Sequence, residues 1–142
     1  MGTVRVEREL DVPAASVWKV LSDFAGFLEW TGGTEGRSIR ITGDGIGMVR
    51  HLVLPGIGEM AERLDILDHA TRTQAYTLVS GTPIGMRTYT GKVVVSDTPT
   101  GCRLNWTGEF TAAPDADADM VAKALEGSYA GMSQALGVAA AL

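Results

Sequence analysis

The N-terminal residues alternate between apolar and charged side chains. The apolar positions are Val4, Val6, Leu10 and Val12. Their spacing, close to a period of two, predicts a half-buried β-strand over residues 3–12, with Arg8 as the one misfit. Pro13 opens the stretch PAASVWKVLSDF, whose apolar residues recur with helical spacing, and a proline suits the first turn of a helix. We predict a helix there, with Trp18 in the core, and a second short helical turn ending at Trp30 before the glycine-rich TGGTEG.

From residue 37 to residue 111 the pattern changes to short alternating runs. These runs are SIRIT, GMVRHLVL, ERLDILD, TQAYTLVS, RTYTGKVVVS and CRLNWTGEFT. Turn-forming residues separate them at intervals of roughly ten residues, and parallel strands need longer crossovers, so we predict an antiparallel meander. ERLDILD is ambiguous, because Met60, Leu64 and Leu67 would also line one face of a helix. We interpret it as a strand.

The C-terminal segment from Asp115 onward returns to helical spacing. Its apolar and small residues at intervals of three and four are Met120, Val121, Ala124, Leu125, Ser128, Met132, Ala135 and Leu136. Asp115, Asp117 and Asp119 lie near the N-terminal end, where the helix dipole favours negative charge. Gly127 and Gly131 each cost roughly 1 kcal/mol relative to alanine in a helix. They hint at space kept beside the helix, or at close packing on the sheet.

The order of elements is therefore one strand, two short helices, six strands and one long helix. A sheet with one apolar face must be covered, and a long amphipathic helix that arrives last can cover it. We predict a single α+β domain over residues 1–142, which is a common size for one domain.

Composition and charge narrow the class of partner. Twelve Lys and Arg against seventeen Asp and Glu give a net charge of −5 without a basic cluster, which disfavours nucleic acid and anionic membrane surfaces. No stretch approaches the roughly twenty apolar residues of a membrane span, and the N-terminus lacks the apolar run of a signal peptide. We therefore expect no nucleic-acid partner and no integral membrane association. The lone Cys102 forms no internal disulfide, so we expect a reducing compartment and place the protein in the cytoplasm.

Residues for common catalytic chemistry are scattered. His51, His69 and Cys102 are scattered along the sequence and do not have the spacing of a metal site. Ser133 falls within the last helix and not in a nucleophile elbow. Residues 56–61 match a dinucleotide fingerprint as a string, but no βαβ unit surrounds them, so we interpret them as a hairpin loop. We expect no metal and no cofactor.

The element order, together with several local phrases, resembles the SRPBCC or START-like helix-grip superfamily. The phrases are VPAASVWKVLSDF, GIGMVRHLVLPG, ERLDILD, YTLVSGTPIGMRTYTGKVVV and CRLNWTGEF. The resemblance covers nearly the whole chain and looks most like the polyketide cyclase/dehydrase-like branch and the plant abscisic-acid receptors. It implies a curved seven-stranded antiparallel sheet wrapped around a long C-terminal helix, with two short helices between the first two strands and a binding site in the gap between sheet and helix.

Two loops flank the mouth of that gap in the superfamily. The gate-loop residues that the resemblance assigns here are Pro55, Gly56, Ile57, Pro83 and Ile84. Glycine and proline in such loops suit a hinge, so we expect a gate that opens and shuts. The abscisic-acid receptors hold the carboxylate of the hormone with a lysine after the short helices. The corresponding TEGRSIRIT has no lysine, so abscisic acid itself is not expected as the ligand.

Strand alternation, with each register anchored by a residue that the superfamily places inward, selects one face for the cavity. The residues on that face are Arg50, Leu52, Leu54, Glu62, Leu64, Ile66, Tyr76, Leu78, Tyr89, Gly91, Val93, Val95, Leu104, Trp106, Gly108 and Phe110. Arg50 and Glu62 would sit opposite or diagonal to each other across a hairpin centred near Gly56. They would form a structural ion pair or orient a ligand. Trp30 would line the mouth or cap the core.

Three hypotheses for the function follow. The leading one is a monomer or homodimer that binds a small hydrophobic, lipid- or polyketide-like molecule, with Arg50, Glu62, Tyr76 and Tyr89 as polar contacts. The second is a polyketide cyclase, aromatase or dehydratase-like enzyme, in which Arg50 steadies an enolate and Glu62 or Tyr89 moves a proton. The third is a stress-associated or protein-interaction domain whose cavity is filled by side chains.

Overall fold

The computed structural model describes residues 1–142. Its elements in chain order are β1 (Gly2–Leu10), α1 (Ala14–Leu21), the 3-10 turn η1 (Phe24–Gly26), α2 (Phe27–Thr31), β2 (Ser38–Thr42), β3 (Val49–Leu54), β4 (Gly58–Asp68), β5 (Thr73–Ser80), the 3-10 turn η2 (Pro83–Gly85), β6 (Met86–Thr98), β7 (Gly101–Ala112) and α3 (Ala118–Ala140). This order confirms the predicted α+β class, including the two short helices between the first two strands.

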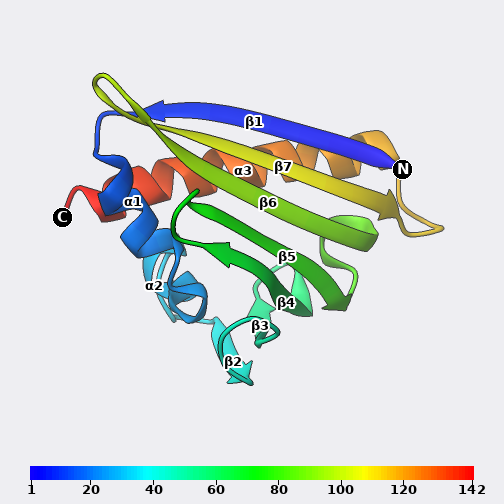
Figure 1. Ribbon diagram of the computed structural model, residues 1–142. Helices are drawn as coiled ribbons and strands as arrows, with labels where there is room; N and C mark the ends of the chain where they lie inside the picture. The colour runs from blue at the N-terminus through cyan, green and yellow to red at the C-terminus, as the bar shows by residue number, and fades with distance from the viewer.

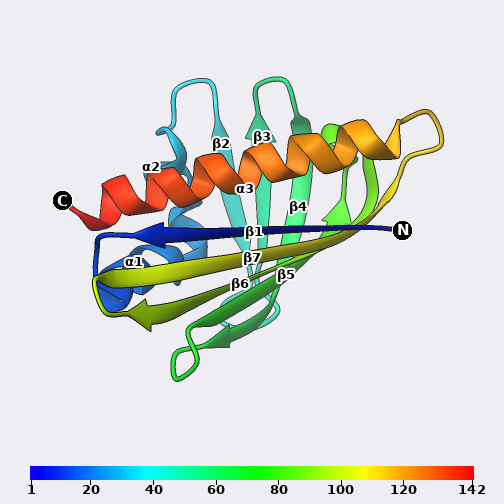
Figure 2. The same ribbon diagram turned by 90° about the horizontal axis from the view of Figure 1, so that it is seen from above.

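All seven strands belong to one antiparallel sheet with the order β1-β7-β6-β5-β4-β3-β2. In Figure 1 the long helix α3 runs behind β1, β7 and β6, while α1 and α2 lie at one end of the sheet. Seen from above in Figure 2, β2, β3 and β4 run steeply across the direction of β1 and β7, so the sheet twists and curves beside α3. The helix-grip arrangement predicted from the sequence is confirmed.

The ambiguous segment ERLDILD is part of strand β4, as interpreted from the sequence. It pairs with β3 on one side and with β5 on the other, and this pairing overrides its helix-like spacing. The prediction that Ile66 faces inward is wrong, because the residue is 45% exposed. The register of β4 and β5 shifts between Leu64 and Ile66, and the shift reverses the alternation. Leu67 packs against the core instead.

The core lies between the inner face of the sheet and one side of α3. Five residues of α3 are buried, and they follow the helical repeat: Val121, Leu125, Tyr129, Ser133 and Leu136. The Asp117 side chain caps the helix by accepting hydrogen bonds from the backbone N–H groups of Asp119 and Met120, at 2.9 and 3.3 Å. No helix of the structure is both long and apolar enough to cross a bilayer.

The sequence-based view of α3 needs two corrections. Met120 belongs to the predicted apolar stripe, yet it is 70% exposed, because the buried face centres on Leu125 and Tyr129. Gly127 and Gly131 lie on the exposed side, where an added Cβ would meet no atom within 4 Å. These two glycines therefore neither keep space beside the sheet nor allow close packing on it.

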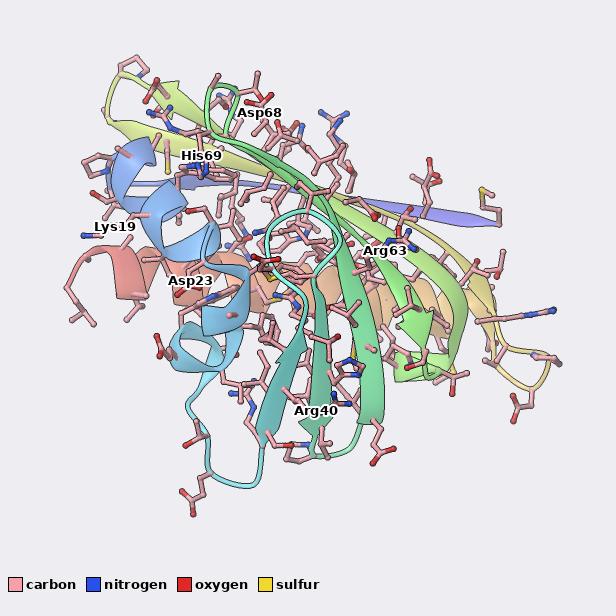
Figure 3. The ribbon with its side chains drawn as sticks, turned by 60° about the horizontal axis from the view of Figure 1, so that its bottom comes forward. Lys19, Asp23, Arg40, Arg63, Asp68 and His69 are labelled. Atoms are coloured by element: carbon pink, nitrogen blue, oxygen red, sulfur yellow. The ribbon has the colours of Figure 1, made fainter.

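Helix α1 closes one end of the core, as its spacing predicts. Val17, Leu21 and Phe24 are buried, and Trp18 is buried beside them. The Trp18 indole N–H donates a 3.0 Å hydrogen bond to Nδ1 of His69, so the turn between β4 and β5 is fastened to α1. Figure 3 shows His69 next to α1, close to Asp68 in the same turn.

Candidate functional site

A cavity of about 90 Å³ lies between the inner face of the sheet and the middle of α3. Twelve of its sixteen lining residues are hydrophobic. From the sheet and the loops beside it the lining comprises Arg50, Leu52, Leu54, Ile57, Met60, Glu62, Tyr76, Pro83, Ile84, Met86 and Tyr89. The helices contribute Phe27, Leu125, Ser128, Tyr129 and Met132. A mostly apolar cavity with a few convergent polar groups is typical of a small-molecule site.

Arg50 and Glu62 form an ion pair in the wall of this cavity. They are directly opposed in the register of β3 and β4, and they are only 5% and 4% exposed. Nε and Nη2 of Arg50 lie 3.0 and 2.9 Å from the same oxygen, Oε1 of Glu62. A pair this deeply buried keeps both charges compensated in a low-dielectric site.

The remaining contacts of the Arg50 guanidinium come from the short helices and β5. Nη1 donates a 3.2 Å hydrogen bond to the backbone carbonyl of Phe24. Cζ lies 3.8 Å from the centre of the Phe24 ring, 4.5 Å from that of Phe27 and 5.3 Å from that of Tyr76. Aromatic faces attract such a cation. Arg50 therefore joins η1 and α2 to the sheet at one end of the cavity.

The second carboxylate oxygen of Glu62 is left without a protein partner. Both contacts from Arg50 fall on Oε1, and no other side chain or backbone group donates to Oε2. The one fully occluded side-chain polar atom that lacks a hydrogen bond anywhere in the molecule is Asn105 Oδ1. Oε2 is therefore not sealed in packed protein, and Glu62 lines the cavity. It is an acceptor that faces the cavity.

Three tyrosines form a hydrogen-bonded chain beside the pair. The Trp106 indole N–H donates to the Tyr76 hydroxyl at 3.3 Å, and the Tyr76 and Tyr89 hydroxyls are 3.2 Å apart. The Tyr89 and Tyr129 hydroxyls are 2.5 Å apart, and Tyr129 donates to the Thr107 carbonyl at 3.3 Å. The Tyr129 ring stacks on Trp106 with ring centres 5.3 Å apart. This chain ties β5, β6 and β7 to α3.

Two glycines in the sheet make room for the tyrosines. Tyr76, Gly91 and Gly108 are consecutive partners across β5, β6 and β7. A Cβ on Gly91 would lie 2.6 Å from the Tyr89 hydroxyl, and one on Gly108 would lie 2.3 Å from the Tyr129 hydroxyl. Contacts this short would force the tyrosine side chains to shift, so the absence of a side chain at both positions lets the phenols lie against the strands.

Burial raises the pKa of all three tyrosines. The pKa of Tyr89 is raised well above its ordinary value, and those of Tyr76 and Tyr129 are also raised. The Glu62 carboxylate adds to each increase, because a phenolate would be a second negative charge nearby. The three phenols are therefore neutral, hydrogen-bonded groups at physiological pH.

Two loops lie at one side of the cavity, and each contributes an isoleucine to it. Ile57 follows β3, and Ile84 lies in η2 between β5 and β6. Ile84 has φ of +50° and ψ of 22°, which is a left-handed conformation that a β-branched residue rarely adopts. It is held between Gly81 and Gly85, which both have positive φ. The loop therefore places an apolar side chain in the cavity at a cost in backbone strain.

The structure brings most of the sequence-predicted site residues together. Nine of them line the cavity: Arg50, Leu52, Leu54, Ile57, Glu62, Tyr76, Pro83, Ile84 and Tyr89. The others lie elsewhere. Leu64, Trp106 and Phe110 are packed in the main core, and Leu78 packs against both this core and the smaller cluster of Leu28, Leu52 and Met60. Pro55 and Gly56 lie in the tip of the β3–β4 turn, and Trp30 stacks edge-on against Phe27 outside the cavity.

Sequence reasoning missed several lining residues on α3 and at strand ends. Phe27, Met60, Met86, Leu125, Ser128, Tyr129 and Met132 line the cavity but were not assigned to the site. The strongest missed signal is Tyr129, which stands four residues after Leu125 and four before Ser133 on the buried face of α3. A fully buried tyrosine must place its hydroxyl against a partner, and here that partner is Tyr89. No group of three or more His, Cys, Asp or Glu side chains is close enough to hold a metal ion.

Comparison with known proteins identifies the family. The model of the family "Polyketide cyclase / dehydrase and lipid transport" matches residues 1–140. No protein of curated function matches the chain by sequence.

Several solved structures share the fold. XoxI from Bacillus cereus is 22% identical, with a TM-score of 0.82 over 98% of this chain and 95% of that one. Ara h 8.0201 is 23% identical, with a TM-score of 0.79 over 98% and 97% of the two chains. Norcoclaurine synthase from Thalictrum flavum, in complex with dopamine and hydroxybenzaldehyde, is 21% identical, with a TM-score of 0.71 over 96% and 84%. At these identities the likeness shows the helix-grip fold alone.

Proposed function

Because the chain belongs to the family of polyketide cyclases, dehydrases and lipid-transport proteins, we propose that it binds a small hydrophobic molecule in the cavity between the sheet and α3. The observation that carries this proposal is the cavity itself, in which twelve of sixteen lining residues are hydrophobic and a buried Arg50–Glu62 pair stands in the wall. Apolar surface buried in such a site supplies affinity, and the few polar groups orient the ligand.

The size of the cavity limits what fits without movement. A dry apolar cavity of about 150 Å³ holds benzene, and the one here measures about 90 Å³. Even a ligand of one ring therefore requires side chains to move. Met60, Met86 and Met132 line the cavity, and unbranched methionine side chains change shape at low cost. Ile57 and Ile84, on the two loops, are the other residues that a ligand would displace.

The proposal is tested by native mass spectrometry of the full chain, purified gently from its own host. A stoichiometric adduct, identified after organic extraction as an apolar compound, supports the binding function. Protein that is repeatedly empty, and that shows no thermal shift with a panel of lipids and polyketide-like aromatics, contradicts it. That result would favour an interaction domain with a filled cavity.

An enzyme that uses the same cavity is the second candidate, and the free Oε2 of Glu62 is the observation that favours it. A carboxylate oxygen that faces the cavity can accept a proton from a bound substrate, and Arg50 beside it can stabilise the resulting anion. A double variant, Arg50→Met with Glu62→Gln, separates the two candidates. A binder keeps its apolar ligands in this variant, whereas an enzyme still binds its substrate but loses turnover. Turnover that survives intact would remove both residues from any catalytic role.

A further inference from the structure

The proposed binding function is the premise of a more specific inference about the ligand. We infer that the cavity selects a neutral molecule that carries a hydrogen-bond donor, such as a phenol or an alcohol, and rejects carboxylates. The donor would meet Oε2 of Glu62. The proposed function requires only that the ligand be apolar. This inference adds that the ligand carries a hydrogen-bond donor.

The first argument is the unused oxygen of Glu62. The side chain is 6% exposed, and its only partner, Arg50, contacts Oε1 through two nitrogens. A carboxylate has acceptor sites on both oxygens, and a buried one without a partner costs free energy. An O–H or N–H on the ligand would satisfy Oε2 with a charge-assisted hydrogen bond, which is stronger than a neutral one.

The second argument is that Arg50 is poorly placed to receive an anion. Its guanidinium is compensated by Glu62, bonded to the Phe24 carbonyl and covered by the Phe24 and Phe27 rings. An incoming carboxylate would approach the edge that Glu62 already occupies and would place a second negative charge beside it. Because the pair is neutral as a whole, a cationic ligand would also be buried without full compensation.

The third argument is the direction of the tyrosine chain. An indole N–H can only donate and a carbonyl oxygen can only accept, so Trp106 and Thr107 fix the two ends. Tyr129 gives its hydrogen to Thr107; Tyr89 must then donate to Tyr129, and Tyr76 to Tyr89. Every hydroxyl hydrogen is used within the protein. Toward the cavity the three phenols offer only lone pairs, which again suit a donor.

Ser128 is the exception among the polar lining residues. Its hydroxyl makes no side-chain hydrogen bond within the protein, and the residue is exposed on α3. It can serve an acceptor group of the ligand at the solvent side of the cavity. The interior end presents Oε2 of Glu62 and the lone pairs of the phenols, beside an Arg50 guanidinium that Glu62 and the Phe24 carbonyl already engage. A ligand would therefore enter with its donor first.

The test uses four probes of nearly one shape: benzene, phenol, benzoate and benzylammonium. Affinities are measured by NMR titration of the full-length protein at neutral pH. We expect phenol to bind at least about ten-fold more tightly than benzene, the factor that one good hydrogen bond to a charged group supplies. We expect benzoate and benzylammonium to bind more weakly than benzene.

A double variant tests whether Glu62 is the group that accepts the hydrogen bond from the ligand. Arg50→Met with Glu62→Met removes both charges and keeps an apolar wall, so the variant should fold where either single change would leave a charge unpaired. The readout is the ratio of the phenol affinity to the benzene affinity in this variant, and that ratio should fall to about one whatever happens to the benzene affinity itself. A preference for phenol that persists in the double variant would overturn the assignment to Glu62.

The remaining outcomes separate this inference from its premise. If benzene binds as tightly as phenol, or if benzoate or benzylammonium binds most tightly of the four, the binding function stands and the donor inference is overturned. If none of the four probes binds the wild-type protein, the donor inference is overturned, while the binding function stands or falls by the mass-spectrometry test of the previous subsection.

Discussion

Two buried polar groups stand side by side in this protein, and they differ in what they leave unused. The chain of Tyr76, Tyr89 and Tyr129 is closed, because each hydroxyl hydrogen has an acceptor inside the protein. The Arg50–Glu62 pair is open, because one carboxylate oxygen has no donor. A satisfied network of this kind holds a core together, whereas an unsatisfied acceptor beside a cavity is available to a ligand. Burial alone would not have separated the two.

The packing is also denser around the tyrosine network than around the Arg50–Glu62 pair. The tyrosine chain lies within an apolar cluster of twenty buried residues that joins α1, α3 and most strands. Near the pair, the separate cluster of Leu28, Leu52 and Met60 has only three buried members. A region with few buried contacts yields more easily than the main core. The cavity therefore adjoins the part of the molecule that can move at the lowest cost.

The largest expected effect on stability comes from breaking the Arg50–Glu62 ion pair. Arg50→Met leaves the Glu62 carboxylate buried without its partner, and we expect the free energy of unfolding to fall by about 3–5 kcal/mol. The double variant with Met at both positions should lose far less, or gain stability, since an apolar pair often replaces a buried ion pair without cost. Urea denaturation of the single and double variants measures both. Equal stability of the two variants would mean that the pair is not isolated from water.

High pH should disrupt the hydrogen-bonded network of Tyr76, Tyr89 and Tyr129. The protein has three tyrosines, and all of them belong to this hydrogen-bonded network. Their pKa values are raised in the folded state, chiefly by burial. The folded state then holds these protons more tightly than the unfolded state, so their contribution is fully present below about pH 10 and is lost as pH rises above it. The loss should reach about 4 kcal/mol per pH unit for three tyrosines, by the linkage slope of 1.36 kcal/mol per proton.

Absorbance at the phenolate wavelength, recorded together with circular dichroism, checks this prediction. Phenolate should appear in one cooperative step with the loss of secondary structure. A tyrosine that ionises near its ordinary pKa while the fold is intact would show that the chain is open to solvent.

A smaller loss is expected from filling the space that the tyrosines occupy. Gly108→Ala places a Cβ 2.3 Å from the Tyr129 hydroxyl, and overpacking of this kind costs about 1–3 kcal/mol. Gly127→Ala is the matched control, because nothing lies within 4 Å of its added Cβ. That change should stabilise α3 by about 0.5–1 kcal/mol. If thermal or urea unfolding gave the same sign for both variants, the close packing at Gly108 would be disproved.

The smallest expected effect on stability concerns Ile84, in the loop between β5 and β6. Ile84→Gly and Ile84→Ala both remove the apolar side chain, but only glycine accepts a φ of +50° without strain. The glycine variant should therefore be the more stable one by about 1 kcal/mol, the reverse of the order at an ordinary position. Paired urea titrations give the difference. An alanine variant that equals or exceeds the glycine variant would show that the loop is not strained at this residue.

The parts of this structure that sequence could predict are those fixed by local periodicity. The strands and helices follow from periods of two and of about 3.6. The pairing of Arg50 with Glu62 follows because a hairpin centred near Gly56 places them opposite each other. The exposure of Ile66 could not be predicted, because a register shift in β4 leaves no clear signature in the sequence. Tyr129 was missed because its partners, Tyr89 and Thr107, are distant in the chain.

The central claim, that the cavity is where a ligand binds, is tested most directly by labelling the methionine methyl groups with carbon-13. The chain has six methionines. Met60, Met86 and Met132 line the cavity, whereas Met1, Met48 and Met120 do not. On titration with phenol, we predict that the first three methyl signals shift together along one binding curve while the other three stay in place. Shifts confined to Met1, Met48 or Met120, or no shift in any of the six, would contradict the account.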